Sequence, residues 1–173
     1  GHLGGAISLD GLNDRIHVPY HVDLTYTGGD LTLSTWVYVD PGETSARLIS
    51  KPWHGSGQYN YVLAVSGTTA SFSLANPAMP GGNLQSVSLS SPGGALSQGA
   101  WHHIAAVADN ANNMAIYVNG SLAATRTNTI TDWTGTNANV PLVLGSLYPY
   151  GSGWAGRTDF SLDGKLDDVA IWN

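Results

Sequence analysis

Three tryptophans lie in segments rich in Gly, Ser and Thr, where flat rings could stack on a ligand. They are Trp53, Trp133 and Trp154, and Tyr150 lies in the same segment as Trp154. Aromatic faces can stack on the apolar C–H face of a sugar ring, while Asn, Asp and Gln bind hydroxyl groups. We therefore predict Trp53, Tyr59, Trp133, Tyr150 and Trp154 as ligand-binding residues. The alternative is that these rings fold back over the ends of the domain and enlarge its core.

The carboxylates are too sparsely arranged for glycoside hydrolysis. That reaction needs two carboxyl groups about 5–9.5 Å apart, which on one strand means positions i and i+2 or i+4. The chain has one Glu, Glu43, in an apparent turn, and nearly all of its Asp residues lie in predicted turns or at strand ends. Motifs for a serine nucleophile or a phosphate-binding loop are also missing. We expect a protein that is not an enzyme.

One turn could bind calcium. The segment from Asp10 to Asp14 contains three oxygen-bearing side chains, those of Asp10, Asn13 and Asp14. Calcium takes about six to eight oxygen ligands, so Asp10 and Asp14 are candidate metal ligands. The spacing does not match an EF-hand loop. The alternative is an ordinary turn in which Asp14 caps its own backbone.

Composition excludes several classes of partner. The net charge is −6, and the six Lys and Arg residues are scattered singly. A basic stripe for phosphate groups is therefore missing, which argues against nucleic acid and anionic membranes as partners. The sequence has no apolar run long enough to span a bilayer. It also has no Cys, which excludes disulfides and thiolate metal sites.

Length and charge content indicate one secreted or cell-surface domain. The 173 residues suit a single domain over 1–173, and Gly1-His2 looks like the remnant of a purification tag. Charged residues make up only 10% of the chain, against about 25% in a typical soluble domain. The polar surface must then come from Ser, Thr, Asn and Gly, a bias that is typical of extracellular β-proteins.

The apolar segments are short, alternate with a period of two and are separated by turn residues. This pattern predicts an all-β fold, a two-sheet antiparallel β-sandwich, and it contains no convincing amphipathic helix. The strands are expected at 6–9, 15–18, 31–39, 46–51, 59–65, 70–75, 84–89, 102–108, 114–118, 121–126, 142–145 and 165–172. Asn119-Gly120 between two of them predicts a type I′ hairpin turn.

Seven segments in order resemble the laminin G-like jelly roll, a concanavalin A-like fold found in bacterial polysaccharide-degrading enzymes, sialidases and adhesins. The segments are 6–19, 31–39 with Trp36 facing inward, 47–51, 101–107, 114–120, 142–145 and 163–172. The resemblance runs from end to end. It implies that Trp36, Trp101 and Trp172 belong to the core, and that the adjacent His102 and His103 are structural.

The resemblance also adds to the calcium prediction. In this fold the first and last strands lie side by side, and many relatives hold a structural calcium there. By position, Asp167 is the residue that matches the family's ligand from the last strand. The expected metal set is therefore Asp10, Asp14 and Asp167, with Ca²⁺ in a structural role.

Fold resemblance says little about the ligand, so several functions stay open. The leading expectation is a non-catalytic carbohydrate-binding module of a secreted polysaccharide-active enzyme or a cell-surface adhesin. The second is a protein-binding or adhesion module. The third is a structural spacer that packs against neighbouring domains of the parent protein, and an enzyme comes fourth.

Overall fold

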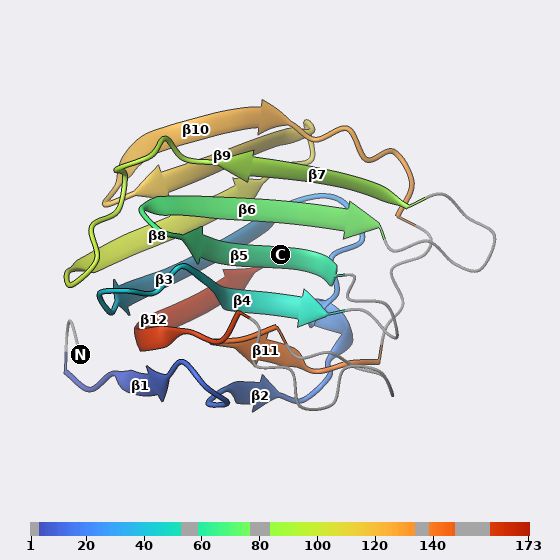
Figure 1. Ribbon diagram of the computed structural model, residues 1–173. Coiled ribbons are helices and arrows are strands. Elements are labelled where there is room, and N and C mark those ends of the chain that lie inside the picture. Colours follow the sequence, from blue (N-terminus) through green and yellow to red (C-terminus); the bar gives the residue numbers. More distant parts are fainter. Residues whose placement is uncertain (1–3, 53–58, 77–83, 134–138, 148–159) are drawn as a thin grey trace.

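The protein is a sandwich of two antiparallel six-stranded sheets (Figure 1). The computed structural model describes residues 4–52, 59–76, 84–133, 139–147 and 160–173. Sheet A has the order β1-β12-β3-β8-β9-β10 and sheet B the order β2-β11-β4-β5-β6-β7. The strands are β1 (Ile7–Asp10), β2 (Ile16–Val18), β3 (Leu31–Val39), β4 (Ser45–Pro52), β5 (Tyr59–Ser66), β6 (Thr69–Asn76), β7 (Gln85–Ser90), β8 (Trp101–Ala108), β9 (Asn113–Val118), β10 (Ser121–Thr127), β11 (Leu142–Leu144) and β12 (Asp163–Trp172). These confirm the predicted all-β sandwich and each of its twelve predicted strands.

The core lies between the sheets and is built by alternation. In β3 the aliphatic side chains at 31, 33, 37 and 39 are buried, and in β6 of sheet B Phe72 and Leu74 are buried in the same core. Fully burying one such side chain contributes about 1.5–3 kcal/mol. Because successive strand residues point to opposite faces, burial of this set sends the residues between them to the outside of the sandwich.

The outward set includes two tryptophans that the sequence resemblance assigned to the core. Trp36 and Trp101 are only partly buried, and neither belongs to the core cluster. Trp172 is 57% exposed. The inward assignment of Trp36, Trp101 and Trp172 was therefore wrong. The aliphatic residues of the same strands fill the space between the sheets, which leaves the outer face of sheet A to the large rings.

The predicted hairpin turn joins β9 to β10. Asn119 and Gly120 have φ angles of 51° and 78°. Both are positive, as a type I′ turn requires, and this confirms the prediction from the Asn-Gly pair. The Asn119 side chain also accepts a hydrogen bond from the His103 amide at 2.9 Å. The hairpin is thereby tied to β8, its neighbour in sheet A.

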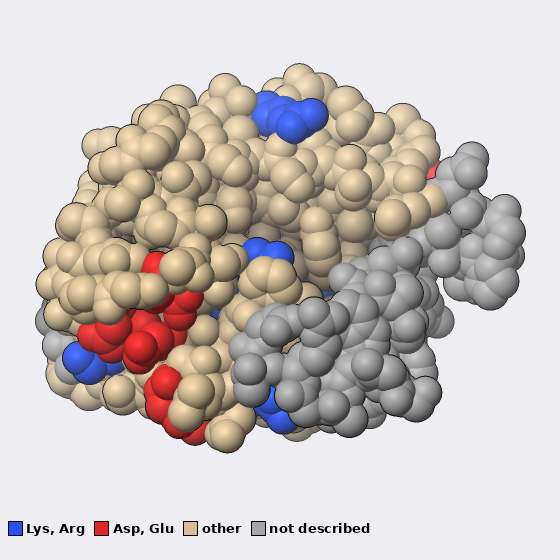
Figure 2. Space-filling model, in the orientation of Figure 1, with Lys and Arg blue, Asp and Glu red and all other residues tan. Residues whose placement is uncertain are grey.

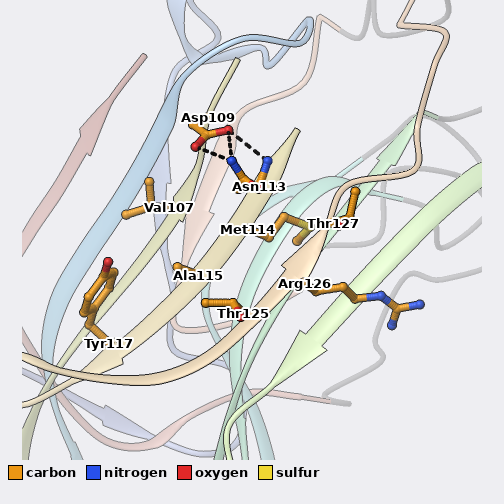
Figure 3. Close-up of a pocket in the computed structure, with 9 residues that line it drawn as sticks. All are labelled: Val107, Asp109, Asn113, Met114, Ala115, Tyr117, Thr125, Arg126 and Thr127. Carbon is orange, nitrogen blue, oxygen red and sulfur yellow. Dashed lines mark hydrogen bonds between the residues drawn. The ribbon is translucent and has the colours of Figure 1, made fainter. Parts of the chain in front are cut away.

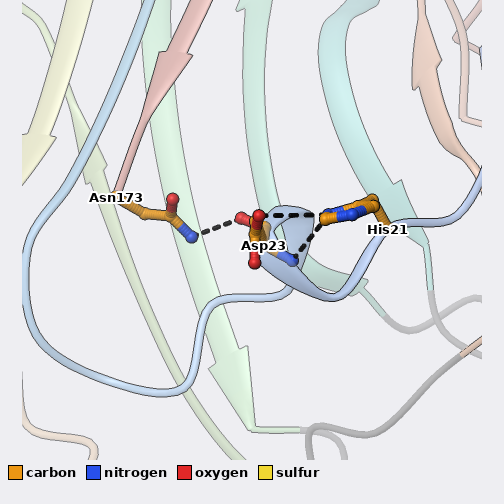
Figure 4. Close-up of polar contacts among 3 residues, drawn as sticks. All are labelled: His21, Asp23 and Asn173. Carbon is orange, nitrogen blue, oxygen red and sulfur yellow. Dashed lines mark hydrogen bonds and ion pairs between the residues drawn. The ribbon is translucent and has the colours of Figure 1, made fainter.

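A short 3₁₀ helix, η1 (Val22–Leu24), was not predicted, and it contacts the last residue of the chain. The side-chain amide of Asn173 donates to the Asp23 carbonyl (Figure 4). His21 caps the helix, with its Nδ1 3.3 Å from the Asp23 amide and 3.2 Å from the Asp23 carboxylate. These contacts hold the end of β12 against the segment between β2 and β3. Within the described residues, no helix is long and apolar enough to span a membrane.

One cation is buried inside the fold. Lys51 is 1% exposed, and its amine donates to the Val140 carbonyl at 2.6 Å. The same amine lies 4.9 Å from the centre of the Tyr20 ring. Burial disfavours the charged form and lowers the pKa of Lys51 to about 8. This lysine therefore links the stability of the fold to pH in the alkaline range.

Candidate functional site

The outer face of sheet A carries a group of partly exposed rings, which we call the aromatic face: Trp36, Tyr38, Trp101, His103 and Tyr117. The strand register places them side by side. Trp36 pairs with His103 and Tyr38 with Trp101 across β3 and β8, and Tyr117 of β9 pairs with Ala105 of β8. Paired side chains on one face lie about 4.5–5.5 Å apart at Cβ, and diagonal ones about 7–8 Å. The rings therefore form one continuous surface over three strands.

Ring contacts hold part of this surface in place. The ring centres of Trp36 and His103 are 5.3 Å apart, and those of Tyr38 and Trp101 are 5.8 Å apart. The amine of Lys165 lies 4.5 Å from the centre of the Tyr38 ring. These distances fit offset and edge-to-face aromatic packing and a cation–π contact. The rings are thus oriented before any ligand arrives, which reduces the entropy lost on binding.

The two histidines make hydrogen bonds within the fold, which agrees with the structural role that the resemblance implies. Nε2 of His103 lies 2.8 Å from the hydroxyl of Ser34. His102 points away from His103, and its Nε2 accepts the Ser97 amide at 3.0 Å. Its Nδ1 lies 3.1 Å from the Asn119 amide nitrogen. His103 thus supports the aromatic face, and His102 joins the segment before β8 to the β9–β10 hairpin turn.

Beside Tyr117 the aromatic face is hollowed. The hollow has a volume of about 570 Å³. Figure 3 shows its lining, which combines apolar Val107 and Ala115, the ring of Tyr117, the hydroxyls of Thr125 and Thr127, and the polar groups of Asp109 and Asn113. One flat ring, a small apolar floor and several hydrogen-bonding groups suit a ligand that has both C–H and hydroxyl faces.

A tight turn at the end of β8 positions the polar side of the hollow. The Asp109 carboxylate accepts the Ala111 and Asn113 amides at 2.9 and 2.8 Å, and the Asn113 side-chain amide at 3.0 and 3.2 Å. The bonds from Asn113 and then from Ala111 lower the pKa of Asp109. Asp109 is therefore a fixed negative charge at neutral pH. Among the described residues that line the hollow it is the sole carboxylate, so they contain no pair for glycoside hydrolysis.

The cation beside the hollow points away from it. Arg126 lies on β10, and its guanidinium donates to the Ser88 carbonyl of β7 at 2.6 Å. Figure 3 shows this side chain and Tyr117 directed to opposite sides. The guanidinium of Arg126 thus joins the edges of the two sheets and does not enter the hollow.

Of the five predicted ligand-binding residues, the structure describes two. Trp133 is partly buried and packs against the core, with its ring centre 4.6 Å from that of Tyr26. A Cβ at Gly28 would lie 2.8 Å from the Trp133 ring. This packing favours the alternative that we stated for Trp133, a ring that enlarges the core. Tyr59 begins β5 and is partly buried. Trp53, Tyr150 and Trp154 lie outside the described residues.

The three predicted metal ligands do not converge. Asp10 pairs with Asp163 across β1 and β12, whereas Asp167 pairs with Trp36. Asp167 is four residues from Asp163, about 13 Å along the strand. The Asp10 carboxylate accepts the amides of Leu12 and Asn13, which is the turn-capping alternative.

Asp14 engages the same turn, since its carboxylate accepts the Asp10 amide at 3.2 Å. Acidic side chains do gather at this end of the sandwich (Figure 2). However, no three His, Asp or Glu side chains within the described part of the chain are grouped to hold a metal ion. Asp10, Asp14 and Asp167 therefore do not fit a shared calcium site, and bound calcium stays a prediction.

The aromatic face was missed at the sequence level although its signal was present. Alternation in the strand at 31–39 separates Trp36 and Tyr38 from the aliphatic residues, and alternation in 114–118 separates Tyr117 from Met114 and Ile116. One strand buries one face against the opposite sheet, so these rings had to point outward once the aliphatic set pointed inward.

The two stacked antiparallel sheets define the class of protein, a jelly-roll β-sandwich domain. The family model described as the concanavalin A-like lectin/glucanases superfamily, of the laminin G type, matches residues 10–173. The chain therefore belongs to that family. No curated protein matches it.

Solved structures share the fold at low sequence identity. The NanB sialidase of Streptococcus pneumoniae has a TM-score of 0.71 and 15% identity over 98% of this chain and 26% of the sialidase. The mouse laminin alpha1 chain, domains LG4-5, has a TM-score of 0.66 and 17% identity over 96% of this chain and 42% of the laminin chain. The CBM40 domain of the Ruminococcus gnavus IT-sialidase, bound to α2,3-sialyllactose, has a TM-score of 0.63 and 17% identity over 92% of this chain and 89% of the CBM40 domain. This chain thus spans about a quarter of the sialidase but most of the CBM40 domain.

Proposed function

We propose that this domain is a non-catalytic carbohydrate-binding module whose binding surface is the aromatic face of sheet A, centred on the hollow beside Tyr117. The observation that carries the proposal is that the partly exposed ring of Tyr117 lines one hollow together with Thr125, Thr127 and Asn113, whose side chains carry hydroxyl and amide groups. A sugar presents C–H groups to a ring and hydroxyls to such polar groups. This surface lies on the face of sheet A, whereas the sequence analysis predicted a site formed mainly by aromatic residues in loops.

The structural neighbours support this proposal. One of them is a carbohydrate-binding domain of nearly the same length, solved with a sialylated sugar, and another belongs to a sialidase. We propose that this domain likewise serves a larger secreted or cell-surface protein by holding it on a glycan. The single carboxylate among the described lining residues supports a binding role without catalysis.

A glycan array of the fluorescently labelled domain tests the proposal. Wild type should bind a set of glycans that share one sugar or linkage. Tyr117→Ala should lose at least about tenfold in affinity, because truncation of an aromatic anchor removes more than about 1.4 kcal/mol of binding free energy. Tyr117→Phe should retain most of the affinity, because the ring remains.

Ser73→Ala is the matched control, since Ser73 lies on the outer face of sheet B. It should bind like wild type. A folded wild-type domain that binds nothing on the array would contradict the proposal, and so would full binding by folded Tyr117→Ala.

The second candidate is a protein-binding module. Leu122, which pairs with Tyr117 across β9 and β10, is 58% exposed, and Trp172 of β12 is 57% exposed. Exposed apolar side chains on one sheet are a feature of protein interfaces. If the folded domain binds no glycan on the array, the protein-binding function becomes the preferred proposal.

A further inference from the structure

The charges around the hollow bear on which glycans it can accept. Asp109 lies inside the hollow, and the Oδ1 of Asp30 accepts the Asn110 amide at 2.9 Å, which places a second carboxylate beside the same turn. Both carboxylates act on the ring of Tyr26 and raise the pKa of its hydroxyl, after the larger effect of burial. A second negative charge thus lies beside the turn that holds Asp109, although Asp30 is not among the described residues that line the hollow.

Among the described residues, no lysine or arginine is placed to balance these negative charges. Arg126 is the sole Lys or Arg among the described lining residues, and its guanidinium is bonded to the Ser88 carbonyl on the other sheet. Lys165 shares the outer face of sheet A but lies at its other end, against Tyr38. On β3, Tyr38 is seven residues from Leu31, the partner of Ala108, which corresponds to about 23 Å. At physiological salt, charges interact strongly only within about 8 Å.

The overall charge has the same sign. The chain carries a net charge of −6, so its long-range field slows the approach of anionic ligands. Recognition of a carboxylate or sulfate would require a fixed cation, most often an arginine in bidentate contact. The one arginine at the hollow is turned to the opposite side of β10 (Figure 3).

We infer that the hollow selects uncharged glycans and rejects sialylated, uronic and sulfated ones, with Asp109 as the residue that determines this selectivity. The inference rests on the proposed function, because it names the ligand class of the same site. Asp109 has two roles in it. Its carboxylate accepts hydroxyl hydrogens of a neutral sugar, and its charge repels an acidic group. Like-charge contacts of this kind cost several-fold to many-fold in affinity.

The test is an array of matched pairs, in which each neutral oligosaccharide is printed beside its acidic counterpart, such as lactose beside sialyllactose and cello-oligosaccharides beside oligoglucuronates. Wild type should bind the neutral member of a pair at least about tenfold more tightly in low salt. The difference should shrink in 0.5 M NaCl, because the charges are then screened. Asp109→Asn should also reduce it, while the remaining amide oxygen still accepts the backbone amides of Ala111 and Asn113.

Asp168→Asn is the charge-matched control. Asp168 is exposed on β12 with a φ of 48°, a conformation that Asn adopts readily, and it is not among the described residues that line the hollow. It should keep the wild-type preference. Thermal unfolding of each variant shows whether the fold is intact, and the salt series on wild type tests the inference without any substitution.

The outcomes separate the two proposals. Equal or tighter binding of the acidic members, lost in Tyr117→Ala, would overturn the charge selectivity and leave the carbohydrate-binding function standing. A neutral preference that is unchanged in folded Asp109→Asn would overturn the role of Asp109. Absence of binding to every pair would overturn the proposed function and the inference together.

Discussion

The outer faces of the two sheets differ in the size and chemistry of their side chains. Sheet A presents the large rings of the aromatic face. The outer face of sheet B, where β6 and β7 pair, presents a ladder of serines, namely Ser71, Ser73, Ser86, Ser88 and Ser90. The hydroxyls of Ser73 and Ser88 lie 2.8 Å apart. Serine side chains offer little contact area to a ligand, whereas each aromatic ring offers a large one.

The inner faces of the same strands do not show this difference. Phe72 and Leu74 alternate with the serines of β6, and Leu33 and Val37 alternate with the rings of β3, and all four are buried. One core is therefore compatible with two unlike surfaces. Folding constrains the inner residues and leaves the outer residues available for function. Large rings on an outer face therefore mark a candidate binding surface.

An inner ring and an outer ring should contribute differently to the stability of the fold. Phe72→Ala should lower the free energy of unfolding by about 3–5 kcal/mol, since it leaves a cavity in the core. Trp36→Ala should cost less than about 2 kcal/mol, because the outer ring is only partly buried. Urea unfolding followed by far-UV circular dichroism measures both. Equal losses would mean that Trp36 belongs to the core after all.

The second prediction concerns ligand length along the aromatic face. Trp101→Ala should weaken binding of a long oligosaccharide by about 1–3 kcal/mol and leave a disaccharide bound in the hollow unaffected. Tyr117→Ala should weaken both, since Tyr117 lines the hollow and Trp101 lies further along the face. Isothermal titration with a length series measures this. Identical behaviour of the two variants would show that the rings do not form one extended surface.

The third prediction concerns Lys51, the buried cation near the end of β4. Lys51 has its pKa lowered to about 8 in the folded protein, against about 10.4 in an unfolded chain. Between these values the unfolded chain binds the proton more tightly, so stability rises with pH in this window and is lost as pH falls toward 8. The gain from pH 7.5 to 9.5 should be about 1–2 kcal/mol.

Lys51→Met provides the comparison for that pH dependence. The variant should lose the rise between pH 7.5 and 9.5, although removal of the bond to the Val140 carbonyl changes its absolute stability. Above pH 10 a second effect sets in, because folding raises the pKa of Tyr26 to about 12. The tyrosine then ionises more readily in the unfolded chain, so the fold loses stability as the pH rises from about 10 to 12. Urea unfolding across the pH series measures both. If the free energy of unfolding rises with pH equally in wild type and variant, the rise comes from another titrating group.

The smallest expected effect belongs to the serine ladder. Ser88→Ala removes one partner of the exposed hydroxyl pair with Ser73, and it should change stability by less than about 1 kcal/mol. It should leave glycan binding unchanged, because the ladder lies on the sheet opposite the hollow. A loss of binding in Ser88→Ala would break the comparison and move the site toward the β7 edge, where Arg126 contacts the Ser88 carbonyl.

Local patterns predicted the fold well, but they did not predict which side chains from distant parts of the chain lie together. Period-two alternation located every strand, and Asn119-Gly120 located a turn, because both signals act between near neighbours in the chain. Trp133 shows the limit. Its flanking residues suggested a ring with little to pack against, yet it packs on Tyr26, more than a hundred residues away. The burial of a loop ring depends on such distant partners, so the residues around Trp133 could not predict it.

Asp167 shows the same limit for the metal prediction. The first and last strands are neighbours, as the family resemblance implied, but the register pairs Asp10 with Asp163. A strand register is a long-range property, and a shift of a few residues moves a carboxylate by about 3.3 Å for each residue. Side-chain type alone could not determine which Asp would lie near the Asp10–Asp14 turn.

The amino-acid sequence by itself determined the strands, the turn at Asn119-Gly120 and the division of each strand into an aliphatic and a polar or aromatic face, because the backbone geometry of a strand is local. Tertiary structure decided which face turned inward. It also brought Trp36 of β3, His103 of β8 and Tyr117 of β9 onto one surface. The physical reason is that hydrogen-bonded register joins strands far apart in the chain, and only that register places their side chains together.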